Sequence, residues 1–322
     1  MATQILGAGA GANVPDHMIP EKVSKKIMIH GVNCNMAHNI AMADAEFEGD
    51  LICGDKVKWF VGKHTDSSIL QSVQGNEDPE TTVVNLCSES AEICGMNKFK
   101  IKLSTDQLRK LQCADLADMY INYLEDLIRS TVEDSWDNSH MAYLLQMAAA
   151  ENTGNNALGL VNLGSPDNPI VLSRTDRSLN ADILEALFMD LHTVIGEQQG
   201  ECGEGDNALV MSSLVSSSAL KVFSDLNTCC SENNVRITGN LPNTILGFDP
   251  FKSTKKVLTV NYKGRQLHYI IAVDKHASGF VSDMYNFRWH QEAFDWFLVG
   301  TEVHGSYVLK PEHVAVAVVT FE

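Results

Sequence analysis

The sequence lacks the features that define several large classes of protein. It has no run of roughly 18 consecutive apolar residues, so we expect no transmembrane helix. No basic residue precedes the apolar stretch near the N-terminus, so we expect no secretory signal and synthesis in a cytoplasm. Basic residues are also scarce, with 24 Lys and Arg against 41 Asp and Glu, which gives a net charge of −17. This balance argues against a protein whose main task is gripping phosphate groups.

The eight cysteines form no recognisable metal or disulfide pattern. No C-x-x-C pair occurs, and no cysteine stands at zinc-ligand spacing from a histidine. Two of them are adjacent in sequence, which is a poor arrangement for a disulfide between them. We therefore expect free, buried thiols. The eight are Cys34, Cys53, Cys87, Cys94, Cys113, Cys202, Cys229 and Cys230.

Motifs that carry chemistry are missing as well. The segment 7–12 fits the spacing G-x-G-x-x-A, but too few residues precede it for a strand, and Pro15 and Pro20 follow, so a dinucleotide site is not expected. There is no phosphate-binding loop, zinc-protease motif, EF-hand or nucleophile elbow. His290, His304 and His313 match no metal spacing and are expected to be hydrogen-bonded structural residues. We predict no catalytic residue, no metal and no cofactor.

The composition that is present is that of a globular protein of about two domains. The chain is 322 residues long, 44% hydrophobic and 20% charged. Strand and helix patterns are mixed without regular alternation, so the predicted class is α+β. Residues 1–35, rich in Gly and Ala with Pro15 and Pro20, indicate an arm that is ordered only when something else holds it.

Two segments alternate polar and apolar residues, which is typical of half-buried strands. They are residues 55–61 and 98–103, and a long acidic stretch that contains Asn76 to Glu80 separates them. We predict that they pair as an extended two-stranded ribbon. The ribbon would carry six of the 24 basic residues: Lys56, Lys58, Lys63, Lys98, Lys100 and Lys102. Two interpretations stay open, a solvated face that guards an edge strand and a basic tongue that lies on an acidic neighbour.

Helix patterns follow. Ser104 and Gln107 fit a capping box at the start of a helix that runs to about Ile128. Residues 137–139 interrupt the pattern, so a second helix is predicted from Trp136 to Ala150. Further predictions are a Ser178-capped helix with an apolar face, a strand at 208–211 that leads into a helix, and strands at 257–262, 267–273 and 314–321.

The order of these parts resembles the major capsid proteins of tailed bacteriophages, which share the Hong Kong 97-type fold. Residues 1–35 look like the N-terminal arm, residues 54–103 like the extended loop, and residues 104–128 like the spine helix. Residues 207–212 and 247–253 resemble parts of the axial domain. The most specific match is residues 304–316, where a Gly-x-Tyr is followed by Pro311-Glu312 and a final apolar strand.

The resemblance implies five segments along the chain. These are an arm and lead-in (1–50), an extended β-hairpin loop (51–103), a peripheral domain with the spine helix (104–155), an axial domain (156–290) and a return to the peripheral domain (291–322). It implies a structural protein and not an enzyme. The expected role is to self-assemble, first as a procapsid, into an icosahedral shell around packaged double-stranded DNA.

The partners follow from the same resemblance. We expect hexamers and pentamers of the chain itself, a portal protein, a possible decoration or cement protein, and non-specific contact with packaged DNA, with no membrane partner. No long acidic helical extension precedes the arm, so a separate scaffolding protein is expected. The expected location is the virion, after assembly in the host cytoplasm.

The residues expected at contacts between subunits are basic on one side and acidic on the other. Lys56, Lys58, Trp59, Lys98, Lys100 and Lys102 would meet Asp115, Asp118 and Glu125 of a neighbour. Two other functions are consistent with the sequence. One is an encapsulin-like bacterial compartment shell, which keeps the fold and changes the cargo, and the other is a cytosolic α+β enzyme.

Overall fold

The computed structural model describes eleven stretches of the chain: residues 36–41, 56–61, 87–92, 95–103, 117–153, 163–175, 178–179, 181–199, 206–226, 244–292 and 295–322. The predicted arm 1–35 and the capping box at Ser104 lie outside these residues. Seven of the eight cysteines also lie outside them, and the side chain of the eighth, Cys87, is not described. The state of the thiols therefore stays a prediction.

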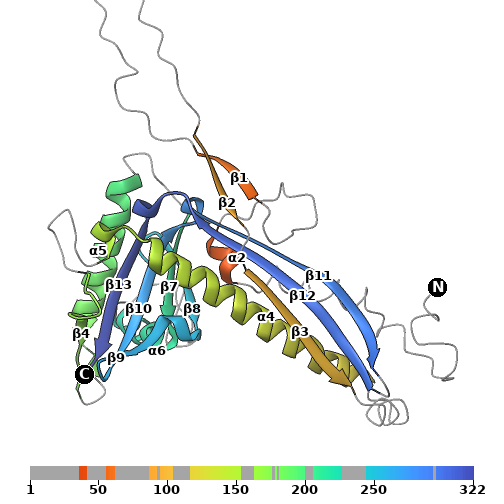
Figure 1. The fold of residues 1–322 in the computed structure, drawn as a ribbon. Coiled ribbons are helices and arrows are strands. Elements are labelled where there is room, and N and C mark those ends of the chain that lie inside the picture. Colours follow the sequence, from red (N-terminus) through yellow and green to blue (C-terminus); the bar gives the residue numbers. More distant parts are fainter. Residues whose placement is uncertain are drawn as a thin grey trace, which may run out of the picture.

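Two units make up the molecule, and Figure 1 shows them at opposite ends of an elongated shape. The first, which we call the axial unit, is a six-stranded sheet flanked by helices. Its strand order is β4-β13-β10-β7-β8, and β9 pairs with β10. The strands are β4 (Ile170–Leu172), β7 (Asn207–Ser212), β8 (Phe248–Ser253), β9 (Thr259–Tyr262), β10 (Arg265–Asp274) and β13 (Val314–Phe321). The small hairpin of β5 (Arg174–Thr175) and β6 (Ser178–Leu179) follows β4.

The central strands of the axial unit are buried on both faces, as the Val-Ala alternation of residues 314–319 predicted. On one face lie α5 (Ala181–Gln199) and α6 (Ser213–Leu226), which pack Phe188 and Val215 against the sheet. On the other face lie Met141 and Leu144 of α4 (Ala117–Met147) and Leu258 of the short helix η5 (Lys256–Leu258). The predicted helices after Ser178 and after the strand at 208–211, and the predicted strands at 267–273 and 314–321, are confirmed. Ser178 does not cap its helix, because it lies in β6 and α5 begins at Ala181. The strand predicted at 257–262 begins only at Thr259, because the preceding residues form η5.

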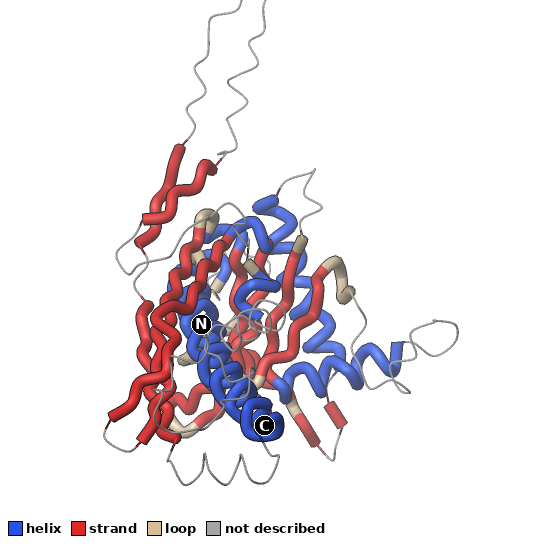
Figure 2. The backbone as a smooth tube through the Cα atoms, turned by 90° about the vertical axis from the view of Figure 1, so that its right-hand side faces the viewer, coloured by secondary structure: helices blue, strands red, loops and turns tan. Residues whose placement is uncertain are grey.

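The second unit, which we call the peripheral unit, is a three-stranded antiparallel sheet, and the helices that the structure describes beside it lie on one face only. Its order is β11-β12-β3, from β3 (Gly95–Leu103), β11 (Ser278–Glu292) and β12 (Asp295–Val308). The N-terminal part of α4 and the short helix α2 (Met36–Ile40) cover one face, where Ile128, Val132 and Trp136 pack against Phe280 and Leu298. Figure 2 shows α4 lying alongside these strands.

A two-stranded ribbon forms a sheet of its own and touches the peripheral unit where β2 meets β12. β1 (Lys56–Val61) pairs antiparallel with β2 (Cys87–Glu92), from Lys56 opposite Glu92 to Val61 opposite Cys87. Figures 1 and 2 both show this ribbon projecting from the body beyond the ends of β11 and β12. The extended β-hairpin predicted from the sequence is therefore present.

The predicted partner of the first ribbon strand was wrong. Residues 98–103 do not pair with residues 55–61, because they belong to β3 and pair with β12 of the peripheral sheet. The true partner, β2, has the sequence CSESAE, which is poor in β-branched and aromatic residues and gives a weak strand signal. The six lysines therefore do not lie on a single ribbon.

The predicted break in the long helix was also wrong, because α4 runs without interruption from Ala117 to Met147. Two of the polar residues at the supposed break make bonds that are compatible with the helix. Asp137 accepts the backbone N–H of Ala37 at 3.0 Å, and Asn138 donates to the carbonyl of Asp134, one turn earlier, at 2.6 Å. Tertiary contact and a side-chain bond to the helix backbone replace the interactions that would otherwise favour a turn.

The described part of the chain passes between the two units three times at one place. The crossings are α4 itself, the link from β10 through η6 (Lys275–Ala277) to β11, and the link from β12 through η7 (Pro311–His313) to β13. Leu309 N donates to Ala277 O at 2.7 Å, and Ala149 N donates to Pro311 O at 3.3 Å. Next to η4 (Ala150–Asn152), these bonds tie the three crossings into a single joint.

Candidate functional site

The residues predicted at subunit contacts lie on three different elements. Lys56, Lys58 and Trp59 lie on β1, Lys98, Lys100 and Lys102 on β3, and Asp118 and Glu125 on α4. Asp115 lies outside the described residues, and the structure gives backbone positions alone for the residues on β1, Asp118 and Glu125. The structure therefore brings together only the three β3 lysines.

The β3 lysines form a basic surface on the side of the peripheral sheet that no described helix covers. Because strand side chains alternate, Phe99 and Ile101 face α4, and Lys98, Lys100 and Lys102 face away from it and are exposed. Arg288 of β11 is exposed too. It pairs with Val299 of β12, and Val299 pairs with Lys100 of β3, so Arg288 and Lys100 lie in one row across the sheet. We call Lys98, Lys100, Lys102 and Arg288 the basic face.

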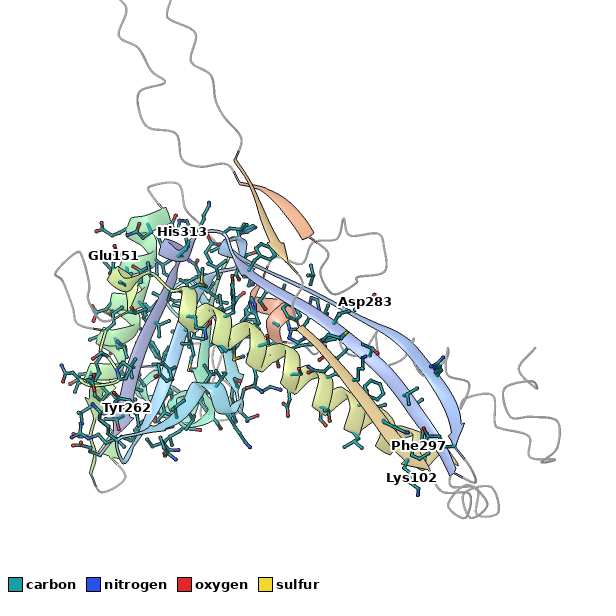
Figure 3. The ribbon with its side chains drawn as sticks, in the orientation of Figure 1. Lys102, Glu151, Tyr262, Asp283, Phe297 and His313 are labelled. Carbon is teal, nitrogen blue, oxygen red and sulfur yellow. The ribbon has the colours of Figure 1, made fainter. Side chains whose placement is uncertain are left out.

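A shallow hollow of about 450 Å³ lies in this face between β3 and β11. Lys98 and Lys100 line one side of it, and Arg288 and Glu292 line the other. Lys100 Nζ is 2.6 Å from Glu292 Oε1 and lies 4.2 Å from the centre of the Phe297 ring. Figure 3 shows Phe297 and Lys102, which are register partners, together at the tip of the sheet. The hollow therefore contains three basic side chains and one carboxylate, and the carboxylate is paired with Lys100.

The covered side of the peripheral sheet contains a buried carboxylate with several donors around it. Glu302 of β12 is almost fully buried and accepts from Trp136 Nε1 at 2.6 Å, His304 Nδ1 at 3.0 Å and Ser135 Oγ at 3.2 Å. The amide of Asn97 also donates to it. Burial pushes the pKa of Glu302 up, but the bonds from His304, Asn97 and Trp136 outweigh burial and hold the pKa below its usual value. This network fastens α4 to β12 and β3.

Beside that network, His140 of α4 is buried with neither ring nitrogen bonded to any described residue. Its ring packs edge-on against Phe280 at 5.4 Å. Burial, with a smaller repulsion from His38, lowers the pKa of His140 to about 3, so the imidazole is neutral near neutral pH. The expectation that the histidines are hydrogen-bonded holds for His304 and His313, which contact Glu302 and Asp274, but His140 is an exception.

A third buried group joins α2 to α4 and to the axial unit. The Asp137 carboxylate accepts from Ala37 N and lies 3.3 Å from Lys255 Nζ, which also bonds Asp134. Burial raises the pKa of Asp137, although the Ala37 amide and Lys255 act against that rise. The pKa of Lys255 is raised, because its bonds to Asp134 and Asp137 outweigh its own partial burial.

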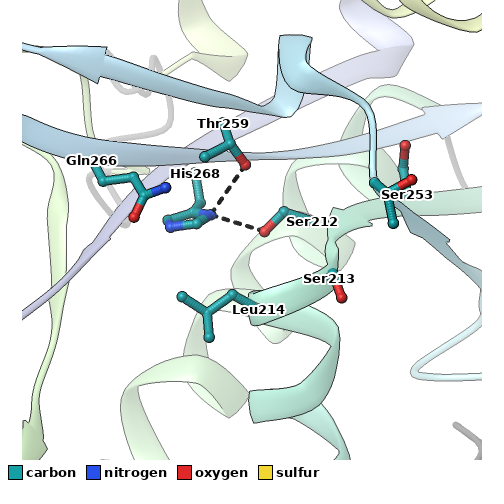
Figure 4. Close-up of a pocket in the computed structure, with 8 residues that line it drawn as sticks. Ser212, Ser213, Leu214, Ser253, Thr259, Gln266 and His268 are labelled. Atoms are coloured by element: carbon teal, nitrogen blue, oxygen red, sulfur yellow. Dashed lines mark hydrogen bonds between the residues drawn. The ribbon is translucent and has the colours of Figure 1, made fainter. Parts of the chain in front are cut away.

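One pocket of the axial unit holds a serine next to a histidine (Figure 4). It measures about 250 Å³ and lies where β7 turns into α6. Ser212 Oγ is 2.9 Å from His268 Nδ1, and Thr259 Oγ1 is 3.4 Å from the same nitrogen. Burial lowers the pKa of His268, so this base is neutral near neutral pH. The Ser212 hydroxyl also lies 3.5 Å from the Val215 amide and so caps the start of α6.

The pocket lacks the third member of a catalytic triad among the residues that line it, since none of them is acidic. The hydroxyl is nearly inaccessible, and we assign it a structural role as a helix cap. Across the described part of the chain, no group of three or more His, Cys, Asp or Glu side chains could hold a metal ion. Within the same residues no helix has the length and apolarity to cross a membrane.

Comparison with protein-family models finds no match, and comparison with curated proteins finds no similar sequence. Comparison with solved structures does find similarity. The capsid structure of cyanophage P-SCSP1u aligns with a TM-score of 0.53 at 12% identity, over 88% of this chain and 86% of that one. The satellite phage P4 procapsid, whose structure includes the size determination protein, aligns at a TM-score of 0.49 and 11% identity, over 98% and 95%. A virus-like particle from Pyrococcus furiosus aligns at 0.46 and 13%, over 92% and 98%.

The cyanophage alignment shows the fold. The chain has the Hong Kong 97-type fold of phage capsid proteins, in the α+β class. The resemblance stated from residues 304–316 and from the order of parts is thus confirmed for the fold.

Several residues of the site escaped the sequence reasoning. The hairpin of β11 and β12 was not predicted, although Tyr285, Phe287 and Trp289 alternate in a way that is typical of a strand. Glu302 had no sequence signal, because a buried carboxylate differs from an exposed one only through its three-dimensional neighbours. Arg288 was missed because it reaches the β3 lysines across the sheet and not along the chain.

Proposed function

We propose that the protein is a structural shell subunit, the major capsid protein of a tailed bacteriophage, and not an enzyme. The observation that carries the proposal is the fold shared with the cyanophage capsid protein along 88% of the chain. The β1–β2 ribbon supports it, because an isolated two-stranded ribbon is at best marginally stable in water. A ribbon that stands off its own body gains support when it lies on another copy.

The finer parts of the proposal follow from the same role. The shell would be icosahedral, built from hexamers and pentamers, assembled as a procapsid in the host cytoplasm and filled with double-stranded DNA. A separate scaffolding protein, a portal protein and a decoration or cement protein would take part. The five segments 1–50, 51–103, 104–155, 156–290 and 291–322 would act as arm, loop, peripheral domain, axial domain and return, with two boundaries adjusted: β11 (Ser278–Glu292) belongs to the peripheral unit, and β13 (Val314–Phe321) returns to the axial unit. In the structure, strands from three of these segments form the peripheral sheet.

We also propose that the ribbon residues Lys56, Lys58 and Trp59 contact Asp115, Asp118 and Glu125 of a neighbouring copy. The charges are complementary, and the ribbon projects far enough to leave its own body. Exposed ion pairs contribute only about 0–1 kcal/mol each, so they would set register and rate of assembly more than strength. Replacing Lys56 and Lys58 by Ser should slow assembly at low salt, and the matched change of Lys252 and Lys256 on the axial unit should not.

Negative-stain electron microscopy of the expressed chain, with and without a candidate scaffolding protein, tests the proposed function. Closed angular particles or tubes are the expected result, and a small discrete oligomer would contradict it and favour an enzyme. The contents of particles purified from their natural source distinguish a phage capsid from a compartment shell. Nuclease-protected double-stranded DNA is expected for a phage, whereas an enclosed enzyme would indicate the encapsulin-like compartment.

A further inference from the structure

The basic face has a regular spacing that restricts what can bind to it. Lys98, Lys100 and Lys102 occupy alternate positions of one strand, so their Cα atoms are about 6.6 Å apart. Arg288 extends the charge across the sheet to β11. With Glu292 included, the face carries four positive charges and one negative charge in a chain whose net charge is −17. A partner that matches it would carry carboxylates at the same spacing.

The chain itself contains one such sequence. Residues 43–50 read ADAEFEGD, which puts Asp44, Glu46, Glu48 and Asp50 at alternate positions. No other stretch of the chain has four acidic residues at every second position. A polypeptide bound in an extended form repeats its side chains on one face at about 6.6 Å, which is the repeat of the lysines. The two sequences therefore have opposite charge and the same spacing, with four carboxylates facing three lysines and Arg288 of the neighbouring strand β11.

We infer that the basic face is a docking surface for the acidic segment 44–50 of a second copy of this chain. The inference rests on the proposed function, because it needs copies to lie side by side. Lys98, Lys100, Lys102 and Arg288 are all exposed in the single chain, which leaves the face accessible to another molecule. Glu292 forms an ion pair with Lys100, which shows that a carboxylate fits between β3 and β11. The Nζ atom of Lys100 lies over the ring of Phe297 at the same place.

The choice of an acidic polypeptide as the occupant rests on the repeat of its charges. Glu292 and the net charge of −17 oppose a phosphate backbone and an acidic polypeptide alike, but the carboxylates of segment 44–50 have the alternate spacing of the lysines. If segment 44–50 binds in an extended form, its carboxylates lie opposite the β3 lysines. Association of a surface with a different surface of an identical copy is also the heterologous contact that builds rings and shells.

A binding measurement on the free subunit tests the surface without requiring assembly. A fluorescent synthetic peptide of residues 42–52 is titrated with the full chain, and anisotropy is recorded at low and high salt. We expect saturable binding that weakens by about tenfold or more in K98S/K100S/K102S and in high salt. The matched variant K252S/K256S/K263S, which removes equal charge from the axial unit, should bind like the unmodified chain. A peptide with the same residues but its acids grouped together should bind less well.

Three outcomes of that titration would overturn the inference. They are no binding, equal binding by both triple variants, and displacement of the peptide by a duplex DNA oligonucleotide at lower concentration than by unlabelled peptide. The last outcome would assign the face to nucleic acid. None of these depends on whether particles form.

Cross-linking in particles then tests the second-copy part of the inference. Unlabelled and nitrogen-15-labelled subunits are mixed before assembly and treated with a zero-length carbodiimide reagent. We expect links from the β3 lysines to Asp44, Glu46 or Glu48 in pairs of mixed isotope as often as in uniform pairs. Uniform pairs alone, or links from these lysines to Glu77, Asp78 and Glu80 instead, would contradict it while leaving the proposed function intact. Failure of the unmodified chain to form particles would contradict the proposed function, and the titration would still decide the surface.

Discussion

The axial and peripheral units differ in how completely each one buries its own sheet. The axial sheet is covered on both faces, by α5 and α6 on one side and by α4 and η5 on the other. Among the described residues, α4 and α2 cover one face of the peripheral sheet, and the other face carries exposed lysines. The described axial sheet is thus buried on both sides, whereas the peripheral sheet has an exposed face, which we propose as a surface for partners. Stability and assembly should therefore respond to different residues.

The largest effect is expected in the axial core. Phe188→Ala should lower the free energy of unfolding by about 3–5 kcal/mol, because the ring is fully buried between α5 and the sheet. Urea unfolding of the free subunit measures this loss. The adjacent Met189 is 47% exposed, so Met189→Ala should stay within about 0.5 kcal/mol. Equal losses for the two variants would contradict the burial described for α5.

A somewhat smaller effect is expected at the buried carboxylate of the peripheral unit. Glu302→Gln should cost about 2–3 kcal/mol, because it removes the charge that several donors share and turns one acceptor into a donor. Thermal and urea unfolding of the free subunit provide the measurement. Glu312 is exposed, and Glu312→Gln serves as the control with no expected change. An unchanged Glu302→Gln would mean that the network does not hold α4 to the sheet.

The pH dependence of stability should depend on His140. Its pKa is about 3 in the folded chain, below the 6.5 of a free histidine, so its contribution is present above pH 6.5 and is lost as the pH falls toward 3. Between about pH 7 and about pH 4.5 the unmodified chain should lose about 2–3 kcal/mol more than His140→Phe, which cannot take up a proton. Urea unfolding at both pH values checks this. Parallel losses in the two proteins would show that the ring is already solvated or paired.

The smallest effect on folding is expected on the basic face. Lys100→Ser removes a pair whose side chains are 46% and 49% exposed, so the free subunit should change by less than about 1 kcal/mol. The assembly rate of the same variant, followed by light scattering at low salt, should fall clearly. If Lys100→Ser lowered the stability of the free subunit but left the assembly rate unchanged, the basic face would have a role in folding and not in contacts with partners.

The sequence predicted best where burial is two-sided or where a helix has one apolar face. The strand at 314–321 and the helices after Ser178 and Ser212 were predicted from local patterns, because their surroundings follow from their own residues. The pairing of residues 98–103 with 55–61 failed because alternation identifies a strand but not its partner. The break expected at residues 137–139 failed because Asp137 is held by Ala37, which is 100 residues away in sequence.

The basic face shows the same limit within the site. The sequence identified the three β3 lysines as a group, since they share one strand. Arg288 and Glu292, which complete the hollow, lie nearly 200 residues further on and join it only through the pairing of β3 with β12 and of β12 with β11. The spacing of charges along one strand can be read from the sequence. Which residues of other strands share the same surface depends on strand pairing, which the sequence alone does not give.

The joint between the units has a topological consequence. Exchange of a domain between identical copies needs a single linker that can open and let one body leave its partner. Here three chain passages, closed by the bonds from Leu309 to Ala277 and from Ala149 to Pro311, would all have to separate together. A peripheral unit therefore cannot be exchanged for that of a neighbour while the axial sheet stays folded. Of the elements that the structure describes, only the β1–β2 ribbon lies outside this constraint.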